Sequence, residues 1–128
     1  LTPAIALKDG KPWLSFSIQG GDFQEQNLIQ MLLNMRHHGM NVQQAAEAAN
    51  FWSYQFRNSF DDHRALPGEI LVRDDTPPWV KAELEDRGYK VKTRDRTSGP
   101  LMGIEIDHDR GTFRGGASNY GDDYGLAW

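Results

Sequence analysis

The sequence of 128 residues predicts a single α+β domain in which helices cover a mainly antiparallel sheet. Strand-like and helix-like apolar patterns follow one another in the order β-β-α-α, then β-α-β-β-β. The dipeptide Asp9-Gly10 is a strong hairpin signal between the first two strands. Hydrophobic residues make up 38% of the chain and charged residues 25%, which is typical of a globular protein.

The first two strands, over residues 3–7 and 13–18, are predicted to lead into the glycine pair Gly20-Gly21. Alternation along the second strand gives it one apolar face, which we expect to join the core, and one face with two hydroxyls. The apolar face carries Leu14, Phe16 and Ile18, and the other face carries Trp13, Ser15 and Ser17.

Two helices are predicted after the glycine pair. Residues 24–38 carry apolar side chains at mostly helical spacing, and Gly39 suits the position just after the helix end. Asn41 is expected to cap a second helix over residues 42–49, because its side chain can accept from the first-turn N–H groups.

The second half of the chain is predicted to return to strands. The aromatic run over residues 51–56 is expected to be extended and to belong to the core, since basic residues do not alternate with it. Thr76 is expected to cap a helix with Pro77 at its first position. The apolar side of that helix is predicted to be Trp79, Val80 and Leu84. The other predicted elements are a polar loop over 58–68, strands over 69–73, 89–93, 101–106 and 112–114, a helix over 78–87, and a glycine-rich tail from Gly115.

Composition and charge argue against several classes of function. The net charge is −4, and no basic patch dominates, so nucleic acid is not an expected partner. No apolar run approaches the ~20 residues that a membrane-spanning helix needs, so no membrane partner is expected. The chain has no cysteine, which excludes disulfides, thiol nucleophiles and thiolate metal sites. These observations leave a cytoplasmic and a periplasmic location equally open.

Two acidic turns resemble metal sites only in composition. Asp61-Asp62-His63 and Asp107-His108-Asp109 lack the helical spacing and the paired second motif of a zinc site, so surface turns are the favoured interpretation. A metal-dependent hydrolase that uses these turns is therefore a weak hypothesis. We expect no metal and no organic cofactor. Asp122 and Asp123 are candidates to hold a substrate amine, or form a solvated turn.

The glycine pair is the strongest functional signal. Between a strand and a helix, Gly20 and Gly21 can bring bare backbone N–H groups close to an anion or a developing oxyanion. The alternative is a purely structural role, in which the two glycines only form a tight turn. Asp22 and Gln24, which follow directly, are candidate substrate-binding residues.

Several stretches, in order along the whole chain, resemble the small subunit of the gamma-glutamyltransferase (gamma-glutamyltranspeptidase) family. The opening hairpin resembles the family's Ser/Thr-Pro-x-Ile-x-x-Lys-Asp-Gly-Lys-Pro, and the glycine pair stands where the family has Pro-Gly-Gly-Ser. The stretches that carry the resemblance are Leu1–Trp13, Gln19–Asp22, Leu32–Asn34, Gly39–Ala45, Ala48–Phe51, Arg87–Val91 and Gly116–Asn119.

The resemblance implies an Ntn-hydrolase fold, an αββα sandwich that is cut autocatalytically into two subunits. Residues 1–128 would be the C-terminal part of the small subunit, a single-domain fragment that is inactive alone. The nucleophilic Thr would lie upstream of this chain, and the backbone N–H groups of Gly20 and Gly21 would form the oxyanion hole. The implied reaction cleaves γ-glutamyl or related amide bonds.

The chain also departs from the family pattern. Gly-Gly-Ser has become Gly20-Gly21-Asp22, and the family's Asp-Pro-Arg has become Asn119-Tyr120-Gly121. Gln24, Gln26 and the Asp-Tyr-Gly tail resemble the divergent gamma-glutamyltransferase-like branch. The expected partner is the missing N-terminal part of the same precursor, and apolar surface meant for it favours self-association of the fragment. The alternative function is a non-catalytic module that binds a small anion or peptide at the glycine pair.

Overall fold

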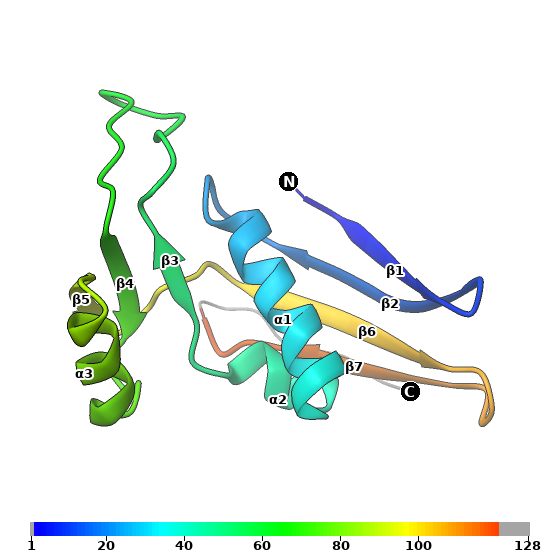
Figure 1. Ribbon diagram of the computed structural model, residues 1–128. Coiled ribbons are helices and arrows are strands. Elements are labelled where there is room, and N and C mark those ends of the chain that lie inside the picture. Colours follow the sequence, from blue (N-terminus) through cyan, green and yellow to red (C-terminus); the bar gives the residue numbers. More distant parts are fainter. Residues whose placement is uncertain (1, 121–128) are drawn as a thin grey trace.

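In the computed structural model, which describes residues 2–120, the chain forms two sheets and three helices (Figure 1). One sheet is four-stranded with the order β1-β2-β6-β7, and the other is three-stranded with the order β3-β4-β5. The strands are β1 (Ala4–Lys8), β2 (Lys11–Ile18), β3 (Phe51–Ser53), β4 (Glu69–Arg73), β5 (Lys90–Arg94), β6 (Leu101–Asp107) and β7 (Thr112–Ala117). The helices are α1 (Gln24–His38), α2 (Val42–Glu47) and α3 (Pro78–Asp86).

The four-stranded sheet is antiparallel throughout, and α1 and α2 cover one of its faces (Figure 1). The predicted core face of β2 is confirmed, because Leu14 and Ile18 are only 0% and 2% exposed. Met31 of α1 and Leu101 of β6 pack into the same buried cluster. Burial of large apolar side chains of this kind is the main favourable term in folding.

Two glycines let α1 and α2 pack closely on the sheet. A Cβ on Gly116 of β7 would lie 2.7 Å from the backbone at Val42 and Gln43, and a Cβ on Gly103 of β6 would lie 2.7 Å from the Met31 methyl group. Glycine within a strand often marks such a close approach. The prediction that Gly115 begins an irregular tail is therefore wrong, since Gly115–Ala117 is the end of β7 and pairs with β6. Asp122 and Asp123 lie outside the described residues.

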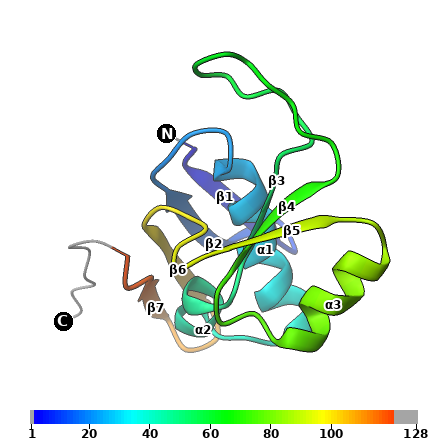
Figure 2. The same ribbon diagram turned by 90° about the vertical axis from the view of Figure 1, so that its left-hand side faces the viewer.

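The three-stranded sheet differs from the single, mainly antiparallel sheet that the sequence predicts. β3 and β4 are antiparallel, but β4 and β5 are parallel, with α3 as the crossover between them (Figure 2). A parallel pair needs such a crossover because a tight hairpin cannot join the two strands.

Helix α3 also corrects two expectations. Its N-cap is Pro77, with no side-chain capping bond, so Thr76 does not cap it. None of its residues is buried, and Trp79, on the predicted apolar side, is 73% exposed. The helix ends as predicted before Gly88, which has the positive φ of 91° that glycine tolerates.

The predicted connection between α1 and α2 is confirmed. Gly39 ends α1 in the left-handed conformation, with φ of 65°. Asn41 caps α2 through a reciprocal capping box with Gln44. The second helix is shorter than predicted because Ala48 already has extended backbone, with ψ of 149°.

Glutamine side chains of α1 complete the open edge of β3. The Gln26 amide donates to the Ser53 carbonyl and accepts from the Ser53 N–H, and Gln30 makes the same pair with Phe51. The spacing fits, because four helical residues rise about 6 Å and two strand residues about 6.6 Å. Helix α1 thereby supplies hydrogen bonds that a neighbouring strand would otherwise supply.

Candidate active site

The glycine turn begins where the ladder of β2 ends. The last backbone bond joins the Gln19 N–H to the Pro100 carbonyl oxygen, at 3.0 Å. Gly99 allows this approach, since a Cβ there would lie 1.9 Å from the carbonyl oxygen of Gln19. Strand β6 is the neighbour of β2 in the sheet. The residue directly before β6, Pro100, therefore holds the chain directly before Gly20-Gly21.

The two glycines differ in how strongly the structure opposes a side chain. Gly20 has φ of 152°, and a Cβ there would lie 2.2 Å from the Phe23 ring, so both the conformation and the space exclude a side chain. Gly21 has no such positive φ, and a Cβ would meet only the edge of the Phe60 ring, at 2.9 Å. The Gly21 carbonyl accepts from the Gln24 N–H at 3.0 Å, which starts α1.

Within the part of the chain that the structure describes, the backbone N–H groups of the glycine turn have no hydrogen-bond acceptor. Among residues 2–120, no acceptor pairs with the N–H of Gly20, Gly21 or Asp22. The N-cap residue of α1, Phe23, makes no side-chain capping bond. This leaves unpaired donors next to the positive end of a helix dipole.

Asp22 holds a long loop beside the turn. Its carboxylate accepts a hydrogen bond from the Ser59 N–H, and this bond is the main cause that lowers the pKa of Asp22 below its ordinary value. The loop over residues 54–66 is itself closed by two backbone bonds, from the Asn58 N–H to the Arg64 oxygen and from the Leu66 N–H to the Tyr54 oxygen. Figure 2 shows it standing out from the sheet that carries it.

Gln24 is buried inside the turn. It is 6% exposed, and its Nε2 donates to the carbonyl oxygen of Ile18 at 3.2 Å. The side chain therefore bridges the end of β2 and the start of α1. Of the four residues predicted for the site, Gly20, Gly21 and Asp22 form the turn itself. The buried side chain of Gln24 joins the two ends of the turn.

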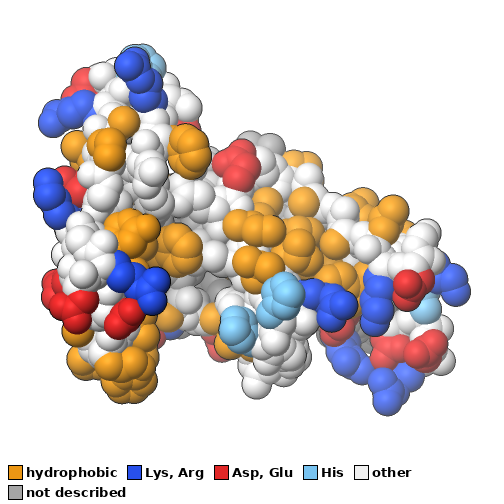
Figure 3. Space-filling model, in the orientation of Figure 1, with side chains coloured by type: hydrophobic (Ala, Val, Ile, Leu, Met, Phe, Trp, Pro, Cys, Tyr) orange, Lys and Arg blue, Asp and Glu red, His pale blue; other side chains and the backbone are white. Residues whose placement is uncertain are grey.

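A pocket of about 200 Å³ lies between the loop and the first turn of α1. In the space-filling view a notch separates the loop from the body of the molecule (Figure 3). Its lining residues come from the glycine turn, α1, β3 and the loop. They are Asp22, Gln26, Trp52, Ser53, Tyr54, Phe56, Arg57, Asn58, Asp62, Arg64 and Leu66.

The aromatic run contradicts its predicted place in the core. Phe56 is 80% exposed and Phe51 is 42% exposed, because β3 is an edge strand and the chain leaves the sheet at Ser53. Trp52 and Tyr54 stack with ring centroids 4.6 Å apart, and they line the pocket instead. This pocket was not predicted from the sequence. Its signal in the sequence is the high density of aromatic residues over 51–56, which were expected to belong to the core.

The two acidic turns use their side chains for local pairing. Asp62 pairs with Arg64, and the His63 Nδ1 lies 2.9 Å from the Asn58 oxygen. Asp107 pairs with Arg110 and Arg114, while the His108 Nε2 lies 2.7 Å from the Pro12 oxygen. Over residues 2–120 the structure contains no group of three potential metal ligands. In the same range, no helix has the length and apolarity to span a membrane.

A second cavity, of about 440 Å³, surrounds Arg73 at the end of β4. The guanidinium pairs with Asp75, which is the main cause that raises the Arg73 pKa, and also donates to the Tyr120 hydroxyl at 3.1 Å. Asn119 and Tyr120, where the chain departs from the family's Asp-Pro-Arg, both line this cavity. Tyr120 is 7% exposed, so this departure places a buried aromatic residue in contact with Arg73 and Arg96.

Among residues 2–120, nothing covers the face of the four-stranded sheet opposite α1 and α2, and this face carries exposed apolar side chains. Ile5, Ser15 and Ile104 lie side by side on β1, β2 and β6, and strand alternation places Ser15 opposite to the buried face of β2. Ile5 is 67% exposed and Ile104 is 48% exposed. The register puts further exposed apolar residues on this face, Met102 and Phe113.

Comparisons with known proteins agree with this architecture. A family model described as gamma-glutamyltranspeptidase matches residues 1–128. The chain is 30% identical over 119 residues to the glutathione hydrolase proenzyme of Bacillus subtilis (strain 168), covering 93% of this chain and 18% of that protein. It is 26% identical over 117 residues to the acylase ACY 1 proenzyme of Pseudomonas sp. (strain SE83), covering 91% and 19%.

Solved structures give the same result. The cephalosporin acylase from Bacillus halodurans superposes with a TM-score of 0.82 at 25% identity, over 98% of this chain and 22% of that chain. An acivicin-inhibited gamma-glutamyltranspeptidase superposes with a TM-score of 0.78 at 24% identity, over 95% and 61%, which shows the fold alone. The chain thus spans about a fifth of the length of the curated relatives it matches. The predicted Ntn-hydrolase fold is confirmed, and the chain belongs to the gamma-glutamyltranspeptidase family.

Proposed function

We propose that the complete protein is an Ntn amidohydrolase or transferase that cleaves γ-glutamyl or related amide bonds, and that this segment supplies its oxyanion turn. The observation that carries the proposal is the pair of N–H groups at Gly20 and Gly21, which have no acceptor within residues 2–120 and lie directly before the first turn of α1. The names of the relatives, a glutathione hydrolase and an acylase, support amide-bond chemistry without fixing the acyl group.

The reaction uses a hydroxyl that this segment does not contain. A Thr upstream of residue 1 attacks the amide carbonyl, its proton passes to the α-amine of the same Thr, and the carbonyl oxygen becomes an oxyanion. The N–H groups of Gly20 and Gly21 stabilise that negative charge, because they are already oriented before the bond forms. Collapse of this intermediate releases the amine with a proton and leaves an ester, which water or an acceptor amine then cleaves.

The partner in this proposal is the rest of the same precursor. The uncovered face around Ile5 and Ile104 supports it, since exposed apolar patches on one side of a sheet mark a surface that packs against another layer. In an αββα sandwich that layer is a second sheet, about 10 Å away. In this proposal the nucleophile lies outside this chain, so the chain alone is expected to be inactive.

Gly21→Ala in the complete enzyme tests the proposed turn. The new methyl meets only the Phe60 ring edge, so the fold tolerates it, but it crowds the N–H groups that face the oxyanion. We expect kcat to fall by ~10²-fold, the order of effect seen when an oxyanion donor is lost. Unchanged kcat would remove the assigned role.

Gly111→Ala is the matched control. It adds the same methyl group at the β6–β7 hairpin, where φ is 64° and nothing lies within 4 Å of a Cβ. Backbone strain should lower its melting temperature slightly, with kcat unchanged. A similar loss of kcat in both variants would assign the effect to folding and not to the glycine turn.

A further inference from the structure

We propose that the pocket beside the glycine turn is a specificity site for a planar, aromatic group that carries a carboxylate. The inference rests on the proposed function, because it treats the pocket as part of the site at which the amide substrate binds. It assigns the stacking contact to Tyr54 and the contact with the carboxylate to Arg57. Both residues line the same cavity of about 200 Å³.

The position of the pocket connects it to the chemistry. Asp22, which lines it, directly follows Gly21, and the loop that forms its outer wall places Phe60 against Gly21. A group in the pocket would therefore belong to a molecule whose reacting carbonyl lies at the turn. The volume equals that of roughly seven waters at about 30 Å³ each, which is enough for one aromatic ring with a short substituent.

The wall of the pocket suits a flat, apolar group. Trp52 and Tyr54 are stacked at an interplanar angle of 29°, and Phe23 contacts Trp52 edge to face at 5.0 Å. Trp52 and Tyr54 are both half-buried, so part of each ring remains accessible. Offset stacking and edge contacts with such rings favour another aromatic ring over an aliphatic chain of equal area.

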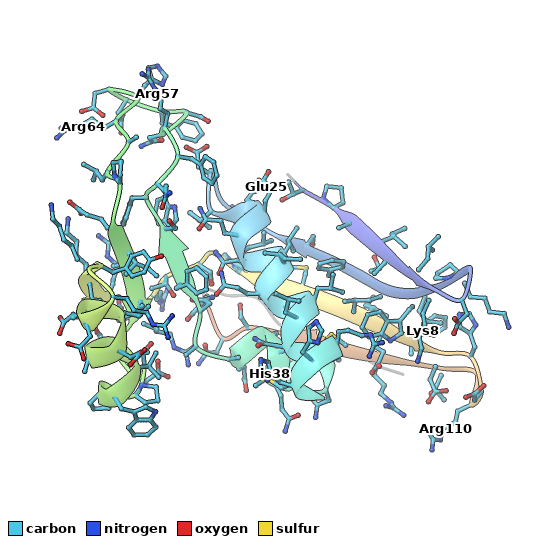
Figure 4. The ribbon with its side chains drawn as sticks, in the orientation of Figure 1. Lys8, Glu25, His38, Arg57, Arg64 and Arg110 are labelled. Atoms are coloured by element: carbon cyan, nitrogen blue, oxygen red, sulfur yellow. The ribbon has the colours of Figure 1, made fainter. Side chains whose placement is uncertain are left out.

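Within the described residues, the cations that line the pocket differ in their pairing, because Arg64 has a carboxylate partner and Arg57 has none. Asp62 pairs with Arg64, the Asp22 carboxylate accepts from Ser59, and both ends of the Gln26 amide are used by Ser53. Among residues 2–120, no carboxylate or carbonyl pairs with the guanidinium of Arg57. Figure 4 shows Arg57 on the loop beside Arg64, away from the helices. A guanidinium pairs with a carboxylate in a planar, two-point geometry, which makes that group the expected anion.

Binding of phenylacetate to the complete protein tests the inference without requiring catalysis. Wild type should bind phenylacetate about tenfold more tightly than neutral phenylacetamide, by titration calorimetry or ligand-observed NMR. Arg57→Gln should lose this preference and Arg57→Lys should keep part of it. Tyr54→Leu should weaken the binding of both compounds.

Arg36→Gln is the control, because it makes the same change at an exposed arginine in the last turn of α1. It should leave the preference intact. The inference is wrong if wild type shows no preference for phenylacetate, or if Arg57→Gln behaves like Arg36→Gln. Because binding is measured directly, these outcomes are distinct from loss of the proposed amidase activity, which Gly21→Ala reports.

Turnover of two isomeric amides then identifies which half of the substrate enters the pocket. One carries an aryl carboxylate in the acyl half, and the other carries it in the amine half, as in amides of 4-aminobenzoate. At least one should exceed its neutral analogue in kcat/KM, with the advantage lost in Arg57→Gln. Equal kcat/KM for charged and neutral analogues in both series would overturn the inference.

Discussion

The carboxylate of Asp22 and the backbone N–H of Ser59 are joined by a hydrogen bond across 37 positions of the sequence. The bond ties the long loop to the residue directly after the glycine pair, and the next residue of the loop, Phe60, lies against Gly21. By charge alone, the carboxylate of Asp22 would oppose an anion bound at the neighbouring glycine pair. In the structure this carboxylate instead accepts the hydrogen bond that holds the loop.

Removing the Asp22 carboxylate should release the loop. Asp22→Ala is expected to speed tryptic cleavage after Arg57 and Arg64, because the side-chain bond from the turn to the Ser59 backbone is lost. Asp22→Asn keeps an acceptor oxygen and should show an intermediate rate. Limited proteolysis followed by mass spectrometry measures this, and equal rates for the three proteins would contradict the assigned tether.

Acid should weaken the same tether. The pKa of Asp22 is lowered by the Ser59 hydrogen bond, so the bond's contribution is fully present above the ordinary value of about 3.9. It is lost as the pH falls through the lowered pKa. The protection factor of the Ser59 amide should therefore fall in that window. The Leu66 amide, bonded to the Tyr54 oxygen, is the internal control and should change little.

The two glycines of the turn should differ in their effect on stability. Gly20→Ala must relieve both a φ of 152° and a clash with the Phe23 ring, at a cost of about 2–4 kcal/mol. Gly21→Ala meets only the movable edge of Phe60 and should cost less than about 1 kcal/mol. Thermal melting of the complete protein compares them, and equal shifts would show that the turn is more pliant than its geometry indicates.

The glutamine bridge between α1 and β3 should contribute measurably to stability. Gln26→Met keeps the size of the side chain but leaves the Ser53 N–H and carbonyl without partners, at about 1–3 kcal/mol. Gln26→Glu removes only the donor and should cost less at pH 7. Gln55→Met is the control, because Gln55 is exposed in the loop. Urea denaturation of the complete protein should rank the variants in that order.

The apolar sheet face should be needed for assembly with the rest of the precursor. Ile104 and Ile29 are 48% and 49% exposed, but Ile104 lies on the uncovered face of the sheet and Ile29 on α1. Ile104→Glu should prevent maturation of the full-length precursor, since it would bury a charge between layers. Ile29→Glu should mature normally. Equal maturation, followed by gel electrophoresis, would place the interface elsewhere.

Local patterns predicted the elements that surround the turn. The alternation of β2, the end of α1 at Gly39 and the capping box at Asn41 each depend on neighbours within a few residues, so sequence reasoning found them. The parallel pairing of β4 with β5 and the continuation of β7 through Gly115–Ala117 depend on partners far along the chain. No local pattern specifies such partners.

The site was predicted in part for the same reason. Gly20 and Gly21 stand out because a strand and a helix flank them directly. The loop that contacts Asp22 and Gly21 cannot be recognised in the sequence, because its composition is typical of any polar connection. Likewise, the exposure of Phe56 follows from β3 being an edge strand, which becomes visible only when the sheet order is known.

The double role of α1 has a mechanical consequence. The helix packs on the large sheet with one side and holds the small sheet through four side-chain hydrogen bonds on another, and the glycine pair directly precedes its first turn. A push on α3 or β5 cannot slide the small sheet without either breaking those bonds or carrying the helix along. These four bonds therefore connect the small sheet to the helix that begins beside the glycine pair.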